Sequence, residues 1–183
     1  MADIFINKHC DDALIKLAKG DMSALAVIYD KLGRKIFMLA FSILHDKDSA
    51  EDVMQDVFLR LAAEAHTYKE KSNAVAFILT VTRNLSLNLL AKRRRDAALQ
   101  RPLEAGEEIA DSSAELYSEK LGELGALRLL DDDERQIVVM KLDAKMKHKA
   151  IAAILGISED ACQKRYRRAL EKVRAYYKKE DKK

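Results

Sequence analysis

The stretch with the clearest chemical potential is residues 77–95, FILTVTRNLSLNLLAKRRR, which has no Gly and no Pro and is predicted to be a helix. Amide and guanidinium groups gather on one side of that helix, and such groups hydrogen-bond base edges and phosphates. The basic run 92–95 would attract a nucleic-acid backbone. The candidate nucleic-acid contacts here are Thr80, Arg83, Asn84, Asn88, Lys92, Arg94 and Arg95, with Phe77 at the edge. An ordinary bundle helix whose basic end complements the helix dipole is the alternative.

The other side of this helix is predicted to be buried, because its apolar residues recur at helical spacing. The predicted stripe is Ile78, Val81, Leu85 and Leu89. The preceding loop, residues 67–73 (TYKEKSN), is polar and carries one aromatic residue, Tyr68. Beside a basic helix, Tyr68 could stack an unpaired base, or the loop could be a plain surface connector.

Residues 49–66 are predicted to form another amphipathic helix, opened by a capping box between Asp48 and Glu51. The residues expected on its buried side are Ala50, Val53, Met54, Val57, Phe58 and Leu61. Asp52, Gln55, Asp56 and Leu59 share the opposite side. This side is either a solvated acidic face or, because it includes Leu59, a docking surface.

A second basic helix lies near the C-terminus, at about 159–178. A short helix at 147–155 and a turn at Gly156-Ile157-Ser158 precede it, in the order typical of a helix-turn-helix. Its predicted buried stripe is Cys162, Tyr166, Ala169, Val173 and Tyr177. Candidate DNA contacts are Ser158, Gln163, Lys164, Arg165, Arg167 and Arg168. A solvated basic helix in a small bundle is the alternative.

These helices fit an all-α protein of two small domains joined by a flexible linker, the second with the helix-turn-helix. The sequence of 183 residues contains only 6 Gly and 1 Pro, which disfavours sheets. We place the first domain at 1–95, the linker at 96–113 and the second domain at 114–183. Other predicted helices span 11–19, 22–44 and 114–130. A further helix is predicted to be capped by the acidic run Asp131-Asp132-Asp133-Glu134, with Ile137, Val138 and Leu142 inward.

Composition narrows the function further. The net charge is only +3, so the distribution of charge has to carry any argument for nucleic acid. Cys10 and Cys162 lie far apart without partners at ligand spacing, so no metal site or disulfide framework is expected. We see no signal peptide and no stretch approaching about 18 apolar residues, which predicts a cytoplasmic protein without membrane insertion. No phosphate loop, nucleophile–base pair or metal cluster is visible, so we expect neither an enzyme nor a cofactor.

The combination resembles the extracytoplasmic-function (ECF) sigma factors, two-domain specificity subunits of bacterial RNA polymerase. AEDVMQDVFLRL, residues 50–61, is similar to the family's polymerase-docking segment. AFILTVTRNLSLNLLAKRRR is similar to its segment for the promoter element nearest the start site, although Phe77 stands in place of Trp and Asn88 in place of Asp. QKRYRRAL, residues 163–170, is similar to the helix that reads the upstream element.

This resemblance implies a non-catalytic protein that binds core RNA polymerase and promoter DNA and directs initiation. By the same resemblance, Asp52, Gln55, Asp56, Phe58 and Leu59 contact the polymerase or support that contact. The resemblance also makes an anti-sigma factor a candidate partner. The alternatives are a stand-alone helix-turn-helix regulator that binds duplex DNA without polymerase, and a nucleic-acid enzyme, which would need an acidic or histidine cluster.

Overall fold

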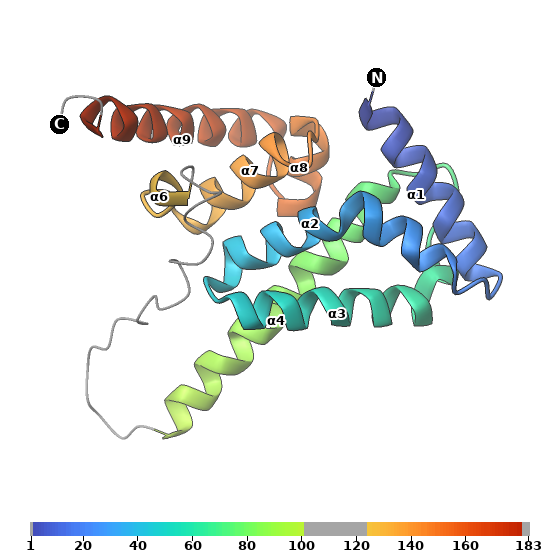
Figure 1. The fold of residues 1–183 in the computed structure, drawn as a ribbon. Helices are drawn as coiled ribbons and strands as arrows, with labels where there is room; N and C mark the ends of the chain where they lie inside the picture. Colours follow the sequence, from blue (N-terminus) through green and yellow to red (C-terminus); the bar gives the residue numbers. More distant parts are fainter. Residues whose placement is uncertain (1, 101–123, 181–183) are drawn as a thin grey trace. The chain divides into compact units, whose positions relative to one another are not determined.

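A computed structural model describes residues 2–100 and 124–180, and every element in these two ranges is a helix (Figure 1). The predicted all-α class is therefore confirmed. The chain separates into two compact units, Met1–Asp111 and Ser112–Lys183, which we describe separately. Residues 101–113 of the predicted linker and 114–123 of the predicted helix 114–130 lie outside the described residues.

The first unit is a helical bundle in which α2 packs against α1, α3 and α4. Its elements are α1 (Ala2–Ala18), α2 (Ala24–Leu44), α3 (Lys47–Glu64), the short 3-10 helix η1 (Ala65–Thr67) and α4 (Ala74–Gln100). In Figure 1, α2 and α3 lie side by side, connected by a tight turn in which His45 has a left-handed backbone (φ 55°). Fully buried Ile28, Leu32, Ile36 and Leu39 form the central stripe of α2.

The first helix is longer than predicted. α1 begins at Ala2 rather than near residue 11, and Cys10 is fully buried on its inner face. Sequence analysis placed Cys10 outside any metal site or disulfide framework and predicted no position for it in the core. Burial raises the pKa of its thiol to about 11, with Lys35 and Lys31 opposing that shift. Cys10 is therefore a core residue that stays protonated at neutral pH.

The cap of α3 also differs from the prediction. Asp46, not Asp48, caps this helix, and its carboxylate accepts a hydrogen bond from the Ser49 backbone nitrogen at 3.0 Å. The Ser49 hydroxyl donates to the same carboxylate. These bonds, led by that hydroxyl and helped by nearby Arg93, hold the pKa of Asp46 below its usual value. The helix therefore begins at Lys47, two residues before the predicted start.

The predicted buried stripe of α4 is displaced. Val81, Leu85 and Leu89 are only half-buried, whereas Thr82 and Ser86 are fully buried. Their hydroxyls donate to backbone carbonyls one turn earlier, Thr82 to Ile78 and Ser86 to Thr82, each at 2.9 Å. Because these bonds satisfy the buried oxygens, two small polar residues can face the bundle where a hydropathy pattern expects leucine. The helix also continues to Gln100, five residues beyond the predicted end of the first domain.

α4 corrects one further prediction, that no segment reaches the length and apolar content of a membrane span. Residues Ala74–Ala98 do so by these two measures, with a mean hydropathy of 1.5 over the best 18-residue window. Ile78 and Leu79 of this helix are fully buried within the first unit, and α4 packs against α1, α2 and α3. About one third of that window is buried, so part of its apolar content serves packing within the first unit.

The second unit contains a helix-turn-helix. Its described elements are α6 (Leu124–Leu127), α7 (Asp132–Leu142), α8 (His148–Leu155) and α9 (Glu159–Glu180). One cluster of its core joins Leu130, Val138 and Ala169, with Leu127, Tyr166 and Val173 packed against it. The predicted cap of α7 is confirmed, because Asp131 and Glu134 form a reciprocal capping box. Leu142, predicted to be inward, is instead 46% exposed.

The turn between α8 and α9 follows the predicted chemistry. Gly156 adopts a left-handed conformation (φ 67°), which a residue without a Cβ accepts at little cost. Ile157 donates its backbone N–H to the Ala152 carbonyl at 3.0 Å, which completes the end of α8. Ser158 caps α9 through its hydroxyl, which accepts from the Ala161 nitrogen at 3.1 Å. This turn fixes the position of α9 against α8.

Candidate protein and nucleic-acid interfaces

One face of α3 is fully open to solvent. Asp52, Gln55, Asp56 and Leu59 are all exposed, and their spacing places them on a single side of the helix. Leu59 is 69% exposed, the largest exposed fraction among the large apolar residues on the surface of the described ranges. On the opposite side Val53, Val57 and Leu61 are buried in the bundle. Exposed leucine framed by acidic and amide groups is typical of a docking surface for another macromolecule.

Phe58 lies at the edge of this face and touches a residue that sequence reasoning missed. Its ring is half-buried and packs at 5.7 Å, tilted by 46°, against the ring of Tyr29 on α2. Tyr29 is 56% exposed, so the apolar surface continues from α3 onto α2. The available signal was an aromatic residue lying off the buried stripe of Ile28 and Leu32. We call Tyr29, Asp52, Gln55, Asp56, Phe58 and Leu59 the α3 face.

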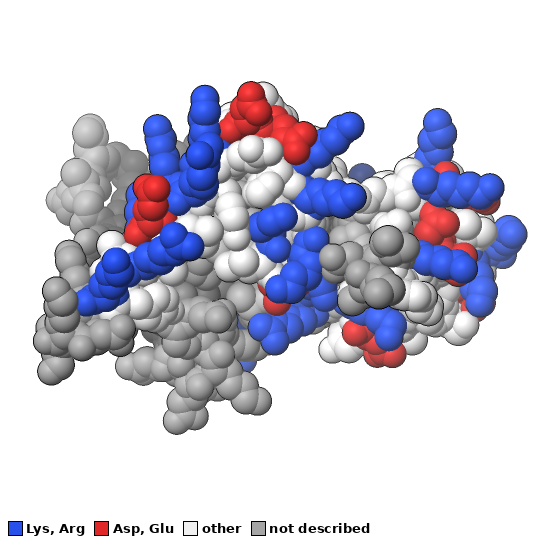
Figure 2. All heavy atoms as spheres, turned by 90° about the horizontal axis from the view of Figure 1, so that it is seen from above, with Lys and Arg blue, Asp and Glu red and all other residues white. Residues whose placement is uncertain are grey.

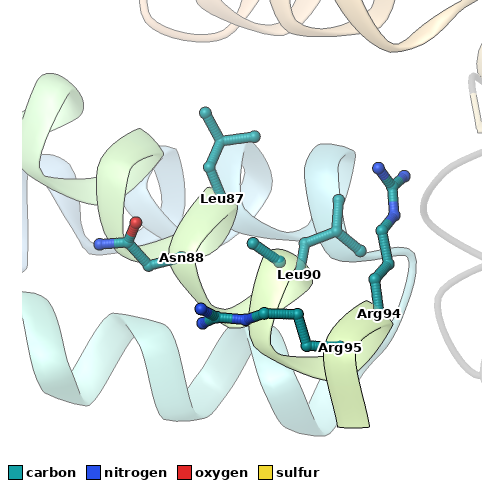
Figure 3. A pocket seen from close by; sticks show the side chains of 6 residues that line it. Leu87, Asn88, Leu90, Arg94 and Arg95 are labelled. Carbon is teal, nitrogen blue, oxygen red and sulfur yellow. The ribbon is translucent and has the colours of Figure 1, made fainter. Parts of the chain in front are cut away.

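The outward side of α4 carries most of the predicted nucleic-acid contacts. Asn84, Asn88, Lys92, Arg94 and Arg95 are exposed, whereas Phe77, Thr80 and Arg83 are half-buried. Figure 3 shows Asn88, Arg94 and Arg95 beside Leu87 and Leu90, around an open hollow that Ala91 completes. Apolar side chains next to guanidinium groups can receive both the bases and the phosphates of a single strand.

Arg93 has a different role from its basic neighbours. Its guanidinium pairs with the Asp46 carboxylate at 3.5 Å and donates to the Ser49 hydroxyl. It therefore ties α4 to the capped start of α3. The basic run 92–95, predicted as a whole to attract a nucleic-acid backbone, therefore includes one arginine that is engaged within the unit. Because α3 and α4 are pinned together, the α3 face and the basic end of α4 hold a fixed relation.

Tyr68 does not occupy the position that was predicted for a stacking residue. Its ring is only 8% exposed and packs at 5.2 Å against Phe77, the first predicted residue of α4. Its hydroxyl donates to the Asp11 carboxylate at 2.5 Å. A ring that covers the core cannot stack on a base without leaving this site, so the prediction of an exposed stacking Tyr68 is wrong for this structure. Phe77 is correspondingly half-covered.

The helix-turn-helix presents a smaller set of contacts than predicted. Lys164, Arg167 and Arg168 are exposed on α9, and Gln163 is half-exposed. Arg165 instead forms an ion pair with Asp133 at the start of α7, and Ser158 caps α9. These two residues therefore stabilise the unit rather than extend from it. On the face shown in Figure 2, basic side chains occur in several separate groups.

Three lysines around the start of α8 were missed as candidate contacts. Lys145, Lys147 and Lys149 are all exposed. They lie at the N-terminus of a helix, where the dipole and the free backbone N–H groups favour phosphate. In the sequence, lysines at every second position around the start of the predicted helix 147–155 could have indicated this basic cluster. Between them His148 is half-buried against Tyr166, and burial, aided by Lys141, holds its pKa below the usual value.

Known proteins share both units. Sigma-70 region 2 matches residues 28–96, and Sigma-70, region 4 matches residues 124–173. The chain belongs to the ECF sigma factors of the sigma-70 family. It is an RNA polymerase sigma factor, and it directs transcription initiation. The region 2 match includes α3 and α4, which a stand-alone helix-turn-helix regulator has no reason to carry, so nothing favours that alternative.

The similarity to individual sigma factors is distant but extensive. The chain is 24% identical over 165 residues to the probable RNA polymerase sigma factor RfaY of Xanthomonas campestris pv. campestris, covering 86% of this chain but only 41% of RfaY. It is 24% identical to the ECF sigma factor SigK of Mycobacterium sp. strain KMS, over 80% of this chain and 72% of SigK. The fold is similar to that of RpoE from Bartonella quintana, with a TM-score of 0.64, 23% identity and coverage of 82% of this chain and 96% of RpoE.

Proposed function

We propose that this sigma factor docks on core RNA polymerase through the α3 face and contacts two separate promoter elements through α4 and α9. The observation that carries the proposal is the 69% exposed Leu59 among Asp52, Gln55 and Asp56. Together with Phe58 and the 56% exposed Tyr29, Leu59 forms an apolar patch rimmed by polar residues, and such patches mark sites of protein interaction. The chain then contributes binding and positioning, while the polymerase contributes the chemistry.

The α3 face indicates the chemistry of its polymerase partner. Leu59, Phe58 and Tyr29 supply apolar and aromatic area, and Asp52 and Asp56 supply negative charge. The complementary surface is a helix or helical hairpin with an apolar centre and lysine or arginine residues at its edge. Arg93 supports this docking indirectly, because it holds the start of α3 against α4.

The exposed side of α4 is suited to a single DNA strand that has separated from its complement. Asn84 and Asn88 offer amide groups to base edges, and Lys92, Arg94 and Arg95 offer positive charge to phosphates. The hollow bordered by Leu87 and Leu90 provides an apolar surface for an unstacked base (Figure 3). A good bidentate contact from an amide to a base edge is worth about 1–3 kcal/mol, comparable with the few kcal/mol that unstacking a base costs. Strand capture therefore requires no nucleotide hydrolysis by this chain.

The loop before α4 belongs to the same surface. Residues 69–73 are all exposed and lead directly into the first turn of α4. Lys69 and Lys71 can contact the backbone of the strand that α4 receives. Because Tyr68 is buried, the half-exposed Phe77 is the aromatic residue of this surface that could stack on a base.

In the second unit, α9 is the candidate helix for the major groove of duplex DNA. Gln163, Lys164, Arg167 and Arg168 lie in its N-terminal half, the part of a recognition helix that reaches base edges. Lys147 and Lys149 at the start of α8 are suited to the adjacent phosphates. Arg165 and Ser158 shape the unit through their contacts with Asp133 and Ala161.

A regulatory partner is also proposed. RpoE of Bartonella quintana was crystallised with the anti-sigma factor NepR. The exposed α3 face and the basic faces of α4 and α9 would bind polymerase and DNA whenever this protein is present. We propose that an anti-sigma factor covers one or more of these faces until a signal releases the protein, which acts in the bacterial cytoplasm without membrane insertion.

The test is reconstitution with bacterial core RNA polymerase. The purified protein should be retained by core polymerase and should cause run-off transcription from a promoter selected out of a random-sequence library. Core polymerase alone provides the background. Tight, sequence-specific duplex binding by the protein alone, with no retention on polymerase, would contradict the proposed docking.

A further inference from the structure

The loop that leads into α4 is held by α1. One oxygen of the Asp11 carboxylate, Oδ1, accepts both the Tyr68 hydroxyl at 2.5 Å and the Lys71 backbone nitrogen at 3.0 Å. The Tyr68 hydroxyl also lies 3.3 Å from the Ser72 carbonyl. Asp11 is 60 positions from Lys71 in sequence, so this is a tertiary contact between the first helix and the loop. The Asp11 carboxylate joins the start and the middle of the loop, and the Tyr68 hydroxyl reaches its end.

A second residue of α1 holds the beginning of α4. The Asn7 side-chain oxygen accepts the Val75 backbone nitrogen at 3.2 Å. The Asn73 side-chain oxygen accepts the Ala76 nitrogen at 2.9 Å. Two of the backbone donors that the start of a helix leaves unpaired are therefore satisfied, one locally and one from α1. The loop and the first turn of α4 are fixed against the same face of α1.

The conformation that these contacts hold is not the one the loop residues prefer. Lys71 has a left-handed backbone (φ 58°), which is uncommon for a residue with a long side chain. Its N–H is the group that Asp11 accepts. Residues 69–73 are exposed, so little packing of their own side chains could maintain this shape. The Asp11 carboxylate and the buried Tyr68 ring below it supply the restraint.

We propose that Asp11 is a positioning residue for strand capture, holding residues 69–73 in the shape that receives the unpaired promoter strand while making no DNA contact itself. The inference rests on the proposed role of α4 and its loop in binding that strand. A loop ordered beforehand does not have to lose its conformational freedom when DNA binds. Without Asp11, the loop keeps more conformational freedom in the free protein, and losing that freedom on binding lowers the affinity for the strand. Tyr68 is not available for stacking, but its buried ring and its hydrogen bond to Asp11 help to hold the loop.

The experiment uses the full chain assembled with core polymerase and a promoter fragment that carries 2-aminopurine at an unpaired position. Capture of the base is followed by fluorescence, and its apparent affinity is measured against salt concentration. Asp11→Ala should weaken capture about tenfold, because the loop must then be ordered when the strand binds. Asp11→Asn should recover most of it, because its Oδ1 can still accept both donors. Asp12→Ala removes a neighbouring exposed carboxylate and serves as the matched control.

Salt separates positioning from contact. Asp11→Ala should leave the slope of affinity against salt unchanged, since no phosphate contact is lost, whereas Arg94→Ala should reduce that slope by about 1. Tyr68→Phe removes only a hydroxyl and should weaken capture about threefold, which provides a milder variant if Asp11→Ala unfolds the unit. The inference is overturned if Asp11→Ala and Asp12→Ala behave alike, or if Asp11→Asn is as defective as Asp11→Ala. If Arg94→Ala also has no effect, the proposed function of α4 fails instead.

Discussion

Truncation of Leu59 should weaken docking on core polymerase without weakening the fold. Burying a leucine fully is worth about 1.5–3 kcal/mol. Because 69% of Leu59 is exposed in the free protein, roughly two thirds of that value, about 1–2 kcal/mol, is still available on docking. Leu59→Ala should therefore raise the Kd for core polymerase by about 5- to 30-fold. The free energy of unfolding should change by less than about 0.5 kcal/mol, because the side chain contributes little to the core.

The assay is competition for core polymerase between a fluorescently labelled wild-type protein and each unlabelled variant. Phe5→Ala is the matched control, since Phe5 is a 59% exposed apolar residue of the same unit on α1. Thermal unfolding of each variant shows that the fold is intact. A Kd for Leu59→Ala within twofold of wild type, or an equal loss in Phe5→Ala, would refute the assignment of the α3 face to the polymerase.

Three further predictions concern the second unit. Arg168→Ala should cost about 1–3 kcal/mol of upstream-element binding, measured by electrophoretic mobility shift against cognate and scrambled duplexes; an equal loss on both would make Arg168 a phosphate contact rather than a base contact. Asp131→Ala removes half of the capping box with Glu134 and should lower stability by about 1 kcal/mol, seen as a fall in Tm; an unchanged Tm would show that the cap is dispensable. Burial lowers the pKa of His148 below 6.5, so the unfolded chain binds the proton more readily and stability should fall as pH drops through and below 6.5. His148→Gln should flatten that fall in thermal melts between pH 7.5 and 5.0, and a parallel pH profile in both proteins would exclude His148 as its cause.

Local turn and cap chemistry was the part of the fold most accessible to prediction. Gly156, Ser158 and Asp131 each act as their residue types suggest, because the left-handed turn and the two helix starts depend on a few neighbouring atoms. The exposed side of α3 was equally readable, since Asp52 and Leu59 stand opposite a regular apolar stripe. These features need no knowledge of distant contacts.

Some errors are local, such as the α3 cap, which is Asp46 rather than Asp48, and others occur where distant parts of the chain meet. Thr82 and Ser86 are buried because their hydroxyls bond to the preceding turn, which a hydropathy pattern does not register. Tyr68 is covered because Asp11 accepts its hydroxyl from 57 positions away. Arg165 looks like its exposed neighbours in sequence, but Asp133 on another helix engages it. Residue type predicts what a side chain can do, and its tertiary partners decide whether it is available to do it.

The most direct test of the central claim is photo-cross-linking from both units within one holoenzyme. A photoreactive residue at Asn88 on α4 and another at Lys164 on α9, in separate variants, are mapped onto a selected promoter with and without core polymerase. We predict two separate positions, unpaired DNA near the start site from Asn88 and upstream duplex from Lys164, with the Asn88 cross-link dependent on polymerase. Cross-links from both residues to one overlapping duplex site, unchanged without polymerase, would contradict the account.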